Sequence, residues 1–191
     1  MKRPKTMHLL LLLLLVLPTL PAHELWTGGT PARGQGLLWG GARLQTENGE
    51  TRWLGLLMSR YGLGWGKALD IVLKLGKEPH DALEVSGTWH LVGKKVQVVA
   101  SGGIFHRSGF GLCSSLTLGC PLGPVALYGV LRAAAFSDRD RLVLPLRAGV
   151  GLGVPLSRGW RLQAQASWPV NTQLVCAEHR PEYLMGVGWT F

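Results

Sequence analysis

The chain has 191 residues, which suits a single domain once an export signal is removed. Its formal net charge of +9 comes from 20 lysines and arginines against 11 aspartates and glutamates. These basic residues are scattered rather than clustered, so a nucleic-acid partner is not expected. After residue 22 no segment approaches the roughly 20 apolar residues of a membrane-spanning helix.

Residues 1–22 have the features of a cleaved export signal. Three basic residues precede an unbroken apolar run over 9–17. A run of about nine apolar residues is too short to cross a bilayer as a helix, and cleavage is expected after Ala22. No cysteine follows the run, so a lipid anchor is not expected. The predicted organisation is a signal peptide over 1–22, an irregular lead-in over 23–34 and a β-domain over 35–191.

From residue 35 the chain reads as successive segments of about ten residues, the length of a tilted membrane strand. The segment from Leu83 to Leu91 alternates best, with apolar residues at its odd positions and polar residues at its even positions. No 3.6-residue periodicity competes. The expected strands cover residues 37–45, 51–60, 65–75, 83–91, 96–105, 110–119, 125–136, 142–154, 160–170 and 183–191.

Turn residues separate these segments. Asn48-Gly49 supplies the positive φ angles of a hairpin turn, and Cys120–Pro124 and Pro155–Gly159 are also predicted to be turns. Pro145 and Pro169 fall inside strands, where proline cannot donate to the ladder, so bulges or strand ends are expected there. The first two strands alternate poorly, and their faces stay unassigned.

An even strand number is typical of bacterial single-chain barrels. Counting the weaker segment over 110–119 gives ten strands, and eight is the alternative if that segment or the first hairpin is misread. In lipid, an open sheet edge would leave backbone groups without hydrogen bonds. The sequence therefore predicts an all-β fold, an antiparallel transmembrane up-and-down β-barrel, with ten strands favoured over eight.

The last nine residues have the most informative pattern. Tyr183, Met185, Val187, Trp189 and Phe191 alternate with mostly small residues, so one face of this strand is apolar and the other is small. This resembles the C-terminal signal of bacterial outer-membrane β-barrels, whose closing strand alternates in this way and ends on Phe.

The whole chain is similar in rhythm to small bacterial outer-membrane β-barrels of the OmpA, OmpW and opacity-protein type, a porin-like class, although no motif selects one family. The resemblance implies export to the outer membrane of a Gram-negative-type envelope. It also implies outer-membrane lipid as the surroundings and insertion by the barrel-assembly machinery through residues 183–191.

Eight tryptophans are many for this length. Indole favours the membrane interface, so tryptophans near strand ends would form an aromatic girdle. In a soluble β-sandwich, core tryptophans would instead lie at strand centres. Only Trp89 clearly has such a position. The predicted girdle residues are Trp53, Trp65, Trp160, Trp168 and Trp189.

Polar side chains opposite the apolar faces are expected to point into the barrel, because a charge facing lipid at mid-depth costs about 2–4 kcal/mol. Barrels of eight to ten strands have narrow lumens that side chains fill, which favours a plugged interior over a small anion-selective leak. Gln97, Gln163 and Gln165 are expected there as well. The predicted interior polar cluster is Asp70, Lys74, Glu84, His90, Arg132, Arg147 and Arg161.

No cofactor or metal is expected, because no cysteine or histidine spacing fits a metal site. Gly149–Gly153 lies in a strand and opens no helix, so it is interpreted as glycines that ease close packing rather than as a nucleotide loop. No catalytic residue is assigned, since a lone histidine near a carboxylate is usually just hydrogen-bonded. The pairs weighed were His80 with Asp81, His90 with Glu84, and His106 with Ser108.

Cys113 and Cys120 are the obvious candidates for a disulfide. Seven residues of extended strand span about 23 Å, whereas a disulfide needs Cα atoms within about 7 Å. The bridge and the strand over 110–119 therefore exclude each other, and the strand is favoured. Whether Cys176 forms a bridge is left open.

The expected function is that of a non-enzymatic outer-membrane barrel with a structural or surface-interaction role. Three alternatives stay open: a narrow pore for small solutes, a lipid-modifying enzyme, and a soluble secreted β-barrel that binds a small ligand. The oligomeric state is also open.

Overall fold

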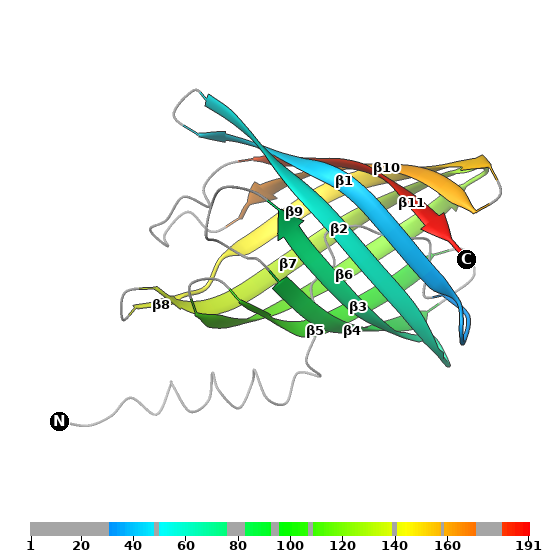
Figure 1. The fold of residues 1–191 in the computed structure, drawn as a ribbon, viewed down its shortest axis with the longest axis horizontal. Coiled ribbons are helices and arrows are strands. Elements are labelled where there is room, and N and C mark those ends of the chain that lie inside the picture. Colours follow the sequence, from blue (N-terminus) through cyan, green and yellow to red (C-terminus); the bar gives the residue numbers. More distant parts are fainter. Residues whose placement is uncertain are drawn as a thin grey trace.

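The computed structural model describes residues 31–47, 50–75, 83–92, 96–106, 109–138, 141–157, 159–170 and 181–191. Among these residues, no helix is long and apolar enough to cross a membrane. The regular elements there are all strands (Figure 1). In chain order they are β1 Gly36–Glu47, β2 Glu50–Gly64, β3 Lys67–Leu75, β4 Leu83–Val92, β5 Gln97–His106, β6 Phe110–Leu122, β7 Val125–Asp138, β8 Arg141–Val143, β9 Leu146–Ser157, β10 Trp160–Pro169 and β11 Glu182–Thr190.

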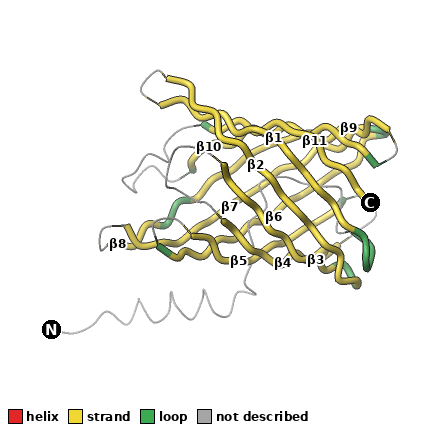
Figure 2. The backbone as a smooth tube through the Cα atoms, in the orientation of Figure 1, coloured by secondary structure: helices red, strands yellow, loops and turns green. Residues whose placement is uncertain are grey.

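The strands form one closed antiparallel barrel. Consecutive strands pair along the chain, and β1 pairs with β11 from Leu37 opposite Thr190 to Gln45 opposite Glu182. Figure 2 shows the strands running obliquely around a common axis. Closure satisfies the backbone groups that an open sheet would leave unpaired at its edges.

The wall has ten strands, because β8 and β9 are two parts of one strand. β7 pairs with both, through Phe136 opposite Val143 and Ala133 opposite Leu146. The break falls at Leu144-Pro145, where the Ala134 amide donates to the Pro145 carbonyl over 3.0 Å. The prediction of ten strands is confirmed, and the alternative of eight is wrong. The strand interruption expected at Pro145 is present.

Several predicted boundaries were too early or too late. The structure continues β2 to Gly64, β6 to Leu122 and β9 to Ser157, through residues that were predicted to be turns. Glycines with positive φ mark the turns instead, including Gly66 at 70° and Gly123 at 62°. A tight two-residue turn needs positive φ, which glycine adopts without strain, whereas Pro121 and Pro155 are tolerated near strand ends.

The end of β10 at Pro169 agrees with the strand end expected there, and Val170, predicted as its last residue, lies beyond it. Other predictions concern segments outside the described residues. They are the signal peptide over 1–22, the lead-in before residue 31 and the Asn48-Gly49 turn.

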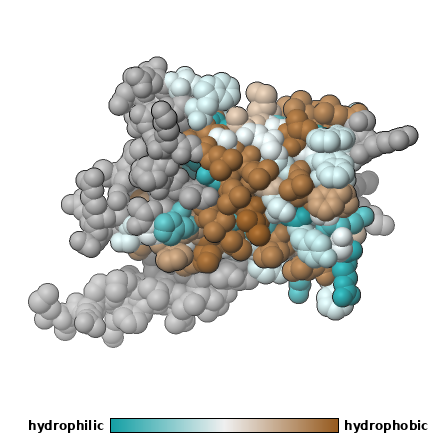
Figure 3. Space-filling model, viewed as in Figure 1, coloured by the Kyte–Doolittle hydropathy of each residue, from teal (hydrophilic) through white to brown (hydrophobic). Residues whose placement is uncertain are grey.

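The two faces of the wall differ in chemistry. Along β3, residues alternate between exposed and buried, with Leu69, Ile71 and Leu73 outside and Asp70 inside. Among the described strand side chains, the charged and histidine residues on the outward face are Lys67 and His106, each at a strand end. Figure 3 shows a hydrophobic band across the middle of the wall. The predicted orientation of polar residues inward is present.

Candidate functional site

The barrel interior contains a buried ion pair at its β2–β4 wall. Asp70 is 0% exposed, and its Oδ1 accepts a hydrogen bond from Arg60 Nε at 2.7 Å. Thr88 Oγ1 donates to the other carboxylate oxygen. Removing two charges from water costs several kcal/mol each, so this pair depends on good geometry and on the additional hydrogen bond.

A second ion pair crosses the lumen. Arg132 on β7 lies 3.2 Å from Glu84 on β4, and β5 and β6 separate these strands around the wall. Glu84 is 2% exposed. Because the two side chains approach from strands that are not neighbours, they occupy space that an open channel would need.

Glu182, the first residue of β11, joins two arginines. Its carboxylate accepts from Arg43 on β1 and lies 3.4 Å from Arg147 on β9. Arg147 also faces Arg132 directly across the β7–β9 ladder. Like charges directly opposite destabilise a sheet. Here Arg132 is paired with Glu84, and Arg147 shares Glu182 with Arg43. Glu182 therefore holds the β11 seam to the strands on both sides.

Space near these arginines is limited. A cavity of about 10 Å³ is bounded by Arg132, Arg147, Gln165 and Glu182, among others. This is about the room that one water molecule needs. Gln165 Oε1 has no hydrogen-bond partner among the described residues, so a water there would satisfy it.

Aromatic side chains fill other parts of the interior by packing against glycines. Trp39 is 1% exposed, and a Cβ at Gly41 or Gly186 would overlap its indole ring. Tyr128 covers Gly151 in the same way. The indole ring of Trp39 therefore packs against the face of the closing strand that carries small residues. The glycines around Gly151 are in a strand and ease close packing, as predicted.

The predicted interior residues do not all come together. Asp70, Glu84 and Arg147 are buried, and Arg132 is nearly so. Lys74, His90 and Arg161 are only half-buried and lie nearer the barrel ends.

Sequence reasoning missed Arg43, Arg60 and Glu182. The first two lie in strands with poor alternation, and Glu182 falls just before the predicted closing strand, which was expected to begin at Tyr183. The alternation of the closing strand could have identified Glu182 as an interior residue. Extended back by one position, it places Glu182 on the same face as Leu184, Gly186 and Gly188.

The five predicted girdle tryptophans are all on the outward face or at a turn. Trp53 and Trp168 lie near one end of the barrel, while Trp65, Trp160 and Trp189 lie near the other. Trp160 stacks on Trp189 with ring centroids 6.0 Å apart. The outward residues of the closing strand are Tyr183, Met185, Val187, Trp189 and Phe191.

Of the catalytic pairs that were weighed, His90 with Glu84 lies wholly within the described residues, and these two are separated on β4 by about 20 Å of extended strand. Glu84 contacts Arg132, and the His106 ring packs edge-on against Phe110 at 5.4 Å. His80, Asp81 and Ser108 lie outside the described residues. In the part of the chain that the structure describes, no three histidine, cysteine, aspartate or glutamate side chains gather as around a metal ion.

Cys113 and Cys120 lie on opposite faces of β6, one buried and one exposed. A disulfide between them is excluded by the strand, as the spacing argument predicted. Cys176 lies outside the described residues.

The fold defines a class, the small antiparallel β-barrel of the outer-membrane type. No family model matches the chain, and no curated protein matches it. Among solved structures, it is similar to the outer membrane protein OprG from Pseudomonas aeruginosa, with 13% identity, a TM-score of 0.41, and coverage of 85% of this chain and 98% of that one.

A second similar structure is the outer membrane protein Ail of Yersinia pestis in a bilayer nanodisc, with 16% identity, a TM-score of 0.41, and coverage of 83% of this chain and all of that one. A third, with 10% identity and a TM-score of 0.43, comes from de novo design of transmembrane β-barrels and covers 85% of this chain and 99% of that one. The closed barrel itself rests on the strand pairing of this chain.

Proposed function

We propose that this chain is an outer-membrane β-barrel protein with a structural or surface-interaction role and a largely plugged interior. The observation that carries the proposal is the inversion of its two faces. Arginine–carboxylate pairs lie inside, and the described outward strand faces are apolar between their ends. A soluble barrel has the opposite arrangement.

The outward belt is large for a protein in water. Exposed leucine, isoleucine and valine side chains occur on every side of the barrel, including Leu73 on β3, Ile104 on β5, Leu131 on β7 and Val150 on β9. Monomeric soluble proteins rarely expose contiguous apolar patches of more than a few hundred Å². Lipid is the solvent that fits this belt, which argues against the soluble ligand-binding alternative.

A plugged interior is supported by contacts that cross the lumen. The Arg132–Glu84 pair reaches across it, and the Glu182 cluster lies at the same level of the barrel, since Arg147 is opposite Arg132. A cavity of about 10 Å³ lies beside them. A hydrated pore for solutes would need an unobstructed path at this level. A narrow pore is the second candidate, and conductance separates the two.

Export and assembly follow as parts of the proposal. Residues 1–22 would direct export, and the closing strand would be read by the barrel-assembly machinery. At the seam, the amides of Gly36 and Phe191 each donate to the other residue's carbonyl over 3.0 Å. Phe191 thus completes the contact between the first and last strands of the wall.

The test combines two measurements. Detergent-extracted membranes are run on a gel with and without boiling, and a band that shifts on heating supports a stable transmembrane barrel. Protein in the soluble fraction with no shift would refute membrane insertion. Planar-bilayer recordings then examine the plug: no single-channel steps are expected from the wild type, and regular steps would favour the pore instead.

A further inference from the structure

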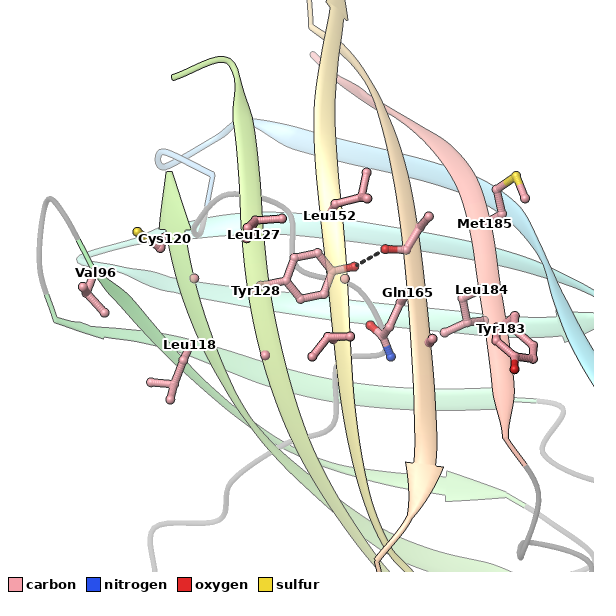
Figure 4. Close-up of a pocket in the computed structure, with 16 residues that line it drawn as sticks. Val96, Leu118, Cys120, Leu127, Tyr128, Leu152, Gln165, Tyr183, Leu184 and Met185 are labelled. Carbon is pink, nitrogen blue, oxygen red and sulfur yellow. Dashed lines mark hydrogen bonds between the residues drawn. The ribbon is translucent and has the colours of Figure 1, made fainter. Parts of the chain in front are cut away.

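A groove of about 750 Å³ lies on the outward face of the barrel wall, beside Val96 and over β6 to β11 (Figure 4). Its part over β10 is a trough between the side chains of β9 and β11. Its lining is almost entirely apolar. The residues that shape it along β10 are Ala164 and Ala166, with Val150 and Leu152 on β9 and Tyr183 and Met185 on β11.

The strand register explains the shape. Ala164 pairs with Leu152 on one side and Met185 on the other, and Ala166 pairs with Val150 and Tyr183. Two small side chains on β10 therefore lie between rows of large ones. Strands are spaced about 4.8 Å apart, so the two rows are separated by roughly 10 Å.

The inner side of the wall supports this groove. Tyr128, on β7, covers Gly151 inside the barrel, and its hydroxyl donates to the Ala164 carbonyl at 3.4 Å. Figure 4 shows this hydrogen bond reaching from β7 past β9 to β10. The backbone under the groove is thus held from inside, where the Tyr128 ring fills the space over Gly151, while Ala164 and Ala166 leave the outer side open.

We propose that the groove binds one hydrocarbon chain of a membrane lipid and retains it after extraction from the bilayer. The inference rests on the proposed membrane location. The groove is continuous with the lipid-facing belt, its lining offers no charge, and its width suits a single rod-like chain.

The experiment compares lipid retention between variants of the full protein extracted in detergent. Each sample is incubated with dipalmitoylphosphatidylglycerol and analysed by native mass spectrometry. The wild type should retain one lipid under conditions that strip the detergent. Ala164→Leu and Ala166→Leu fill the groove and should lower the retained fraction at least tenfold. Ala133→Leu, on the outward face of β7 away from the groove, should retain lipid like the wild type.

The heat-shift gel checks that each variant is folded, and Ala164→Val serves if leucine prevents folding. A wild type that shifts on heating but retains no lipid would overturn this inference alone. So would equal retention in Ala164→Leu and the wild type, or a bound mass equal to a second chain. A wild type without a heat shift would instead overturn the membrane proposal on which the inference rests.

Discussion

Trp39 on β1 lies directly against Gly186 on β11, and the closing strand has no room for a side chain at that position. The indole is almost completely buried inside the barrel, in an apolar cluster with Leu37, Met58 and Leu184. The seam between the first and last strands is therefore packed by a ring on one strand and glycine on the other. This is how a glycine-rich strand can still have a filled inner face.

Substituting Gly186 with alanine should destabilise the barrel by about 1–3 kcal/mol, because the added methyl group overpacks the Trp39 site. Gly40→Ala is the matched control. Gly40 lies on the outward face of β1 with no atom near its Cβ position, so its substitution should change stability by less than about 0.5 kcal/mol. Denaturant unfolding in lipid vesicles measures both. Equal effects would contradict the proposed packing.

Replacing Asp70 with alanine should cost about 3–5 kcal/mol, because it leaves the Arg60 guanidinium buried without its carboxylate. The double variant Arg60→Met/Asp70→Leu should recover much of that loss, since an apolar pair removes the desolvation penalty of both charges. Unfolding free energies of the two variants and the wild type test this. A double variant that is less stable than Asp70→Ala would show that the charges have another role.

An arginine at Ile71 should destabilise the inserted barrel by about 2–4 kcal/mol, since this side chain points outward at the middle of β3. The control is Leu75→Arg, on the same face at the last residue of β3, where the cost near the interface is about 0–1 kcal/mol. Folding into vesicles measures the difference. Similar costs at both positions would contradict a lipid-facing wall.

Deleting Phe191 should reduce the amount of folded protein in membranes several-fold. The deletion removes both backbone hydrogen bonds to Gly36 and the ring that lies 5.2 Å from Trp189. Phe191→Tyr, which keeps the aromatic ring and the backbone, is expected to assemble normally. The heat-shifted fraction in isolated membranes is the readout. Wild-type levels after the deletion would argue against the closing strand as an assembly signal.

The sequence was most informative where the signal is local. Period-2 alternation follows from the geometry of one strand, so the inward and outward faces of 83–92 and of the closing strand could be read residue by residue. Turn boundaries were less accurate, because proline and glycine were weighted alike. Among the described residues, positive φ angles mark the tight turns, at Trp65, Gly66, Gly123 and Gly159, while Pro121 and Pro155 lie within strands.

By itself the sequence determined that the chain is β-structured and that one face of most of its strands is apolar, and it favoured ten strands over eight. The tertiary structure alone decided which arginine meets which carboxylate. Arg60 with Asp70, Arg132 with Glu84, and Arg43 and Arg147 with Glu182 are pairings set by register and by closure of β1 on β11. Arg60 and Asp70 lie on consecutive strands, ten residues apart. The other pairs join strands far apart in the chain, so no local pattern of residues records them.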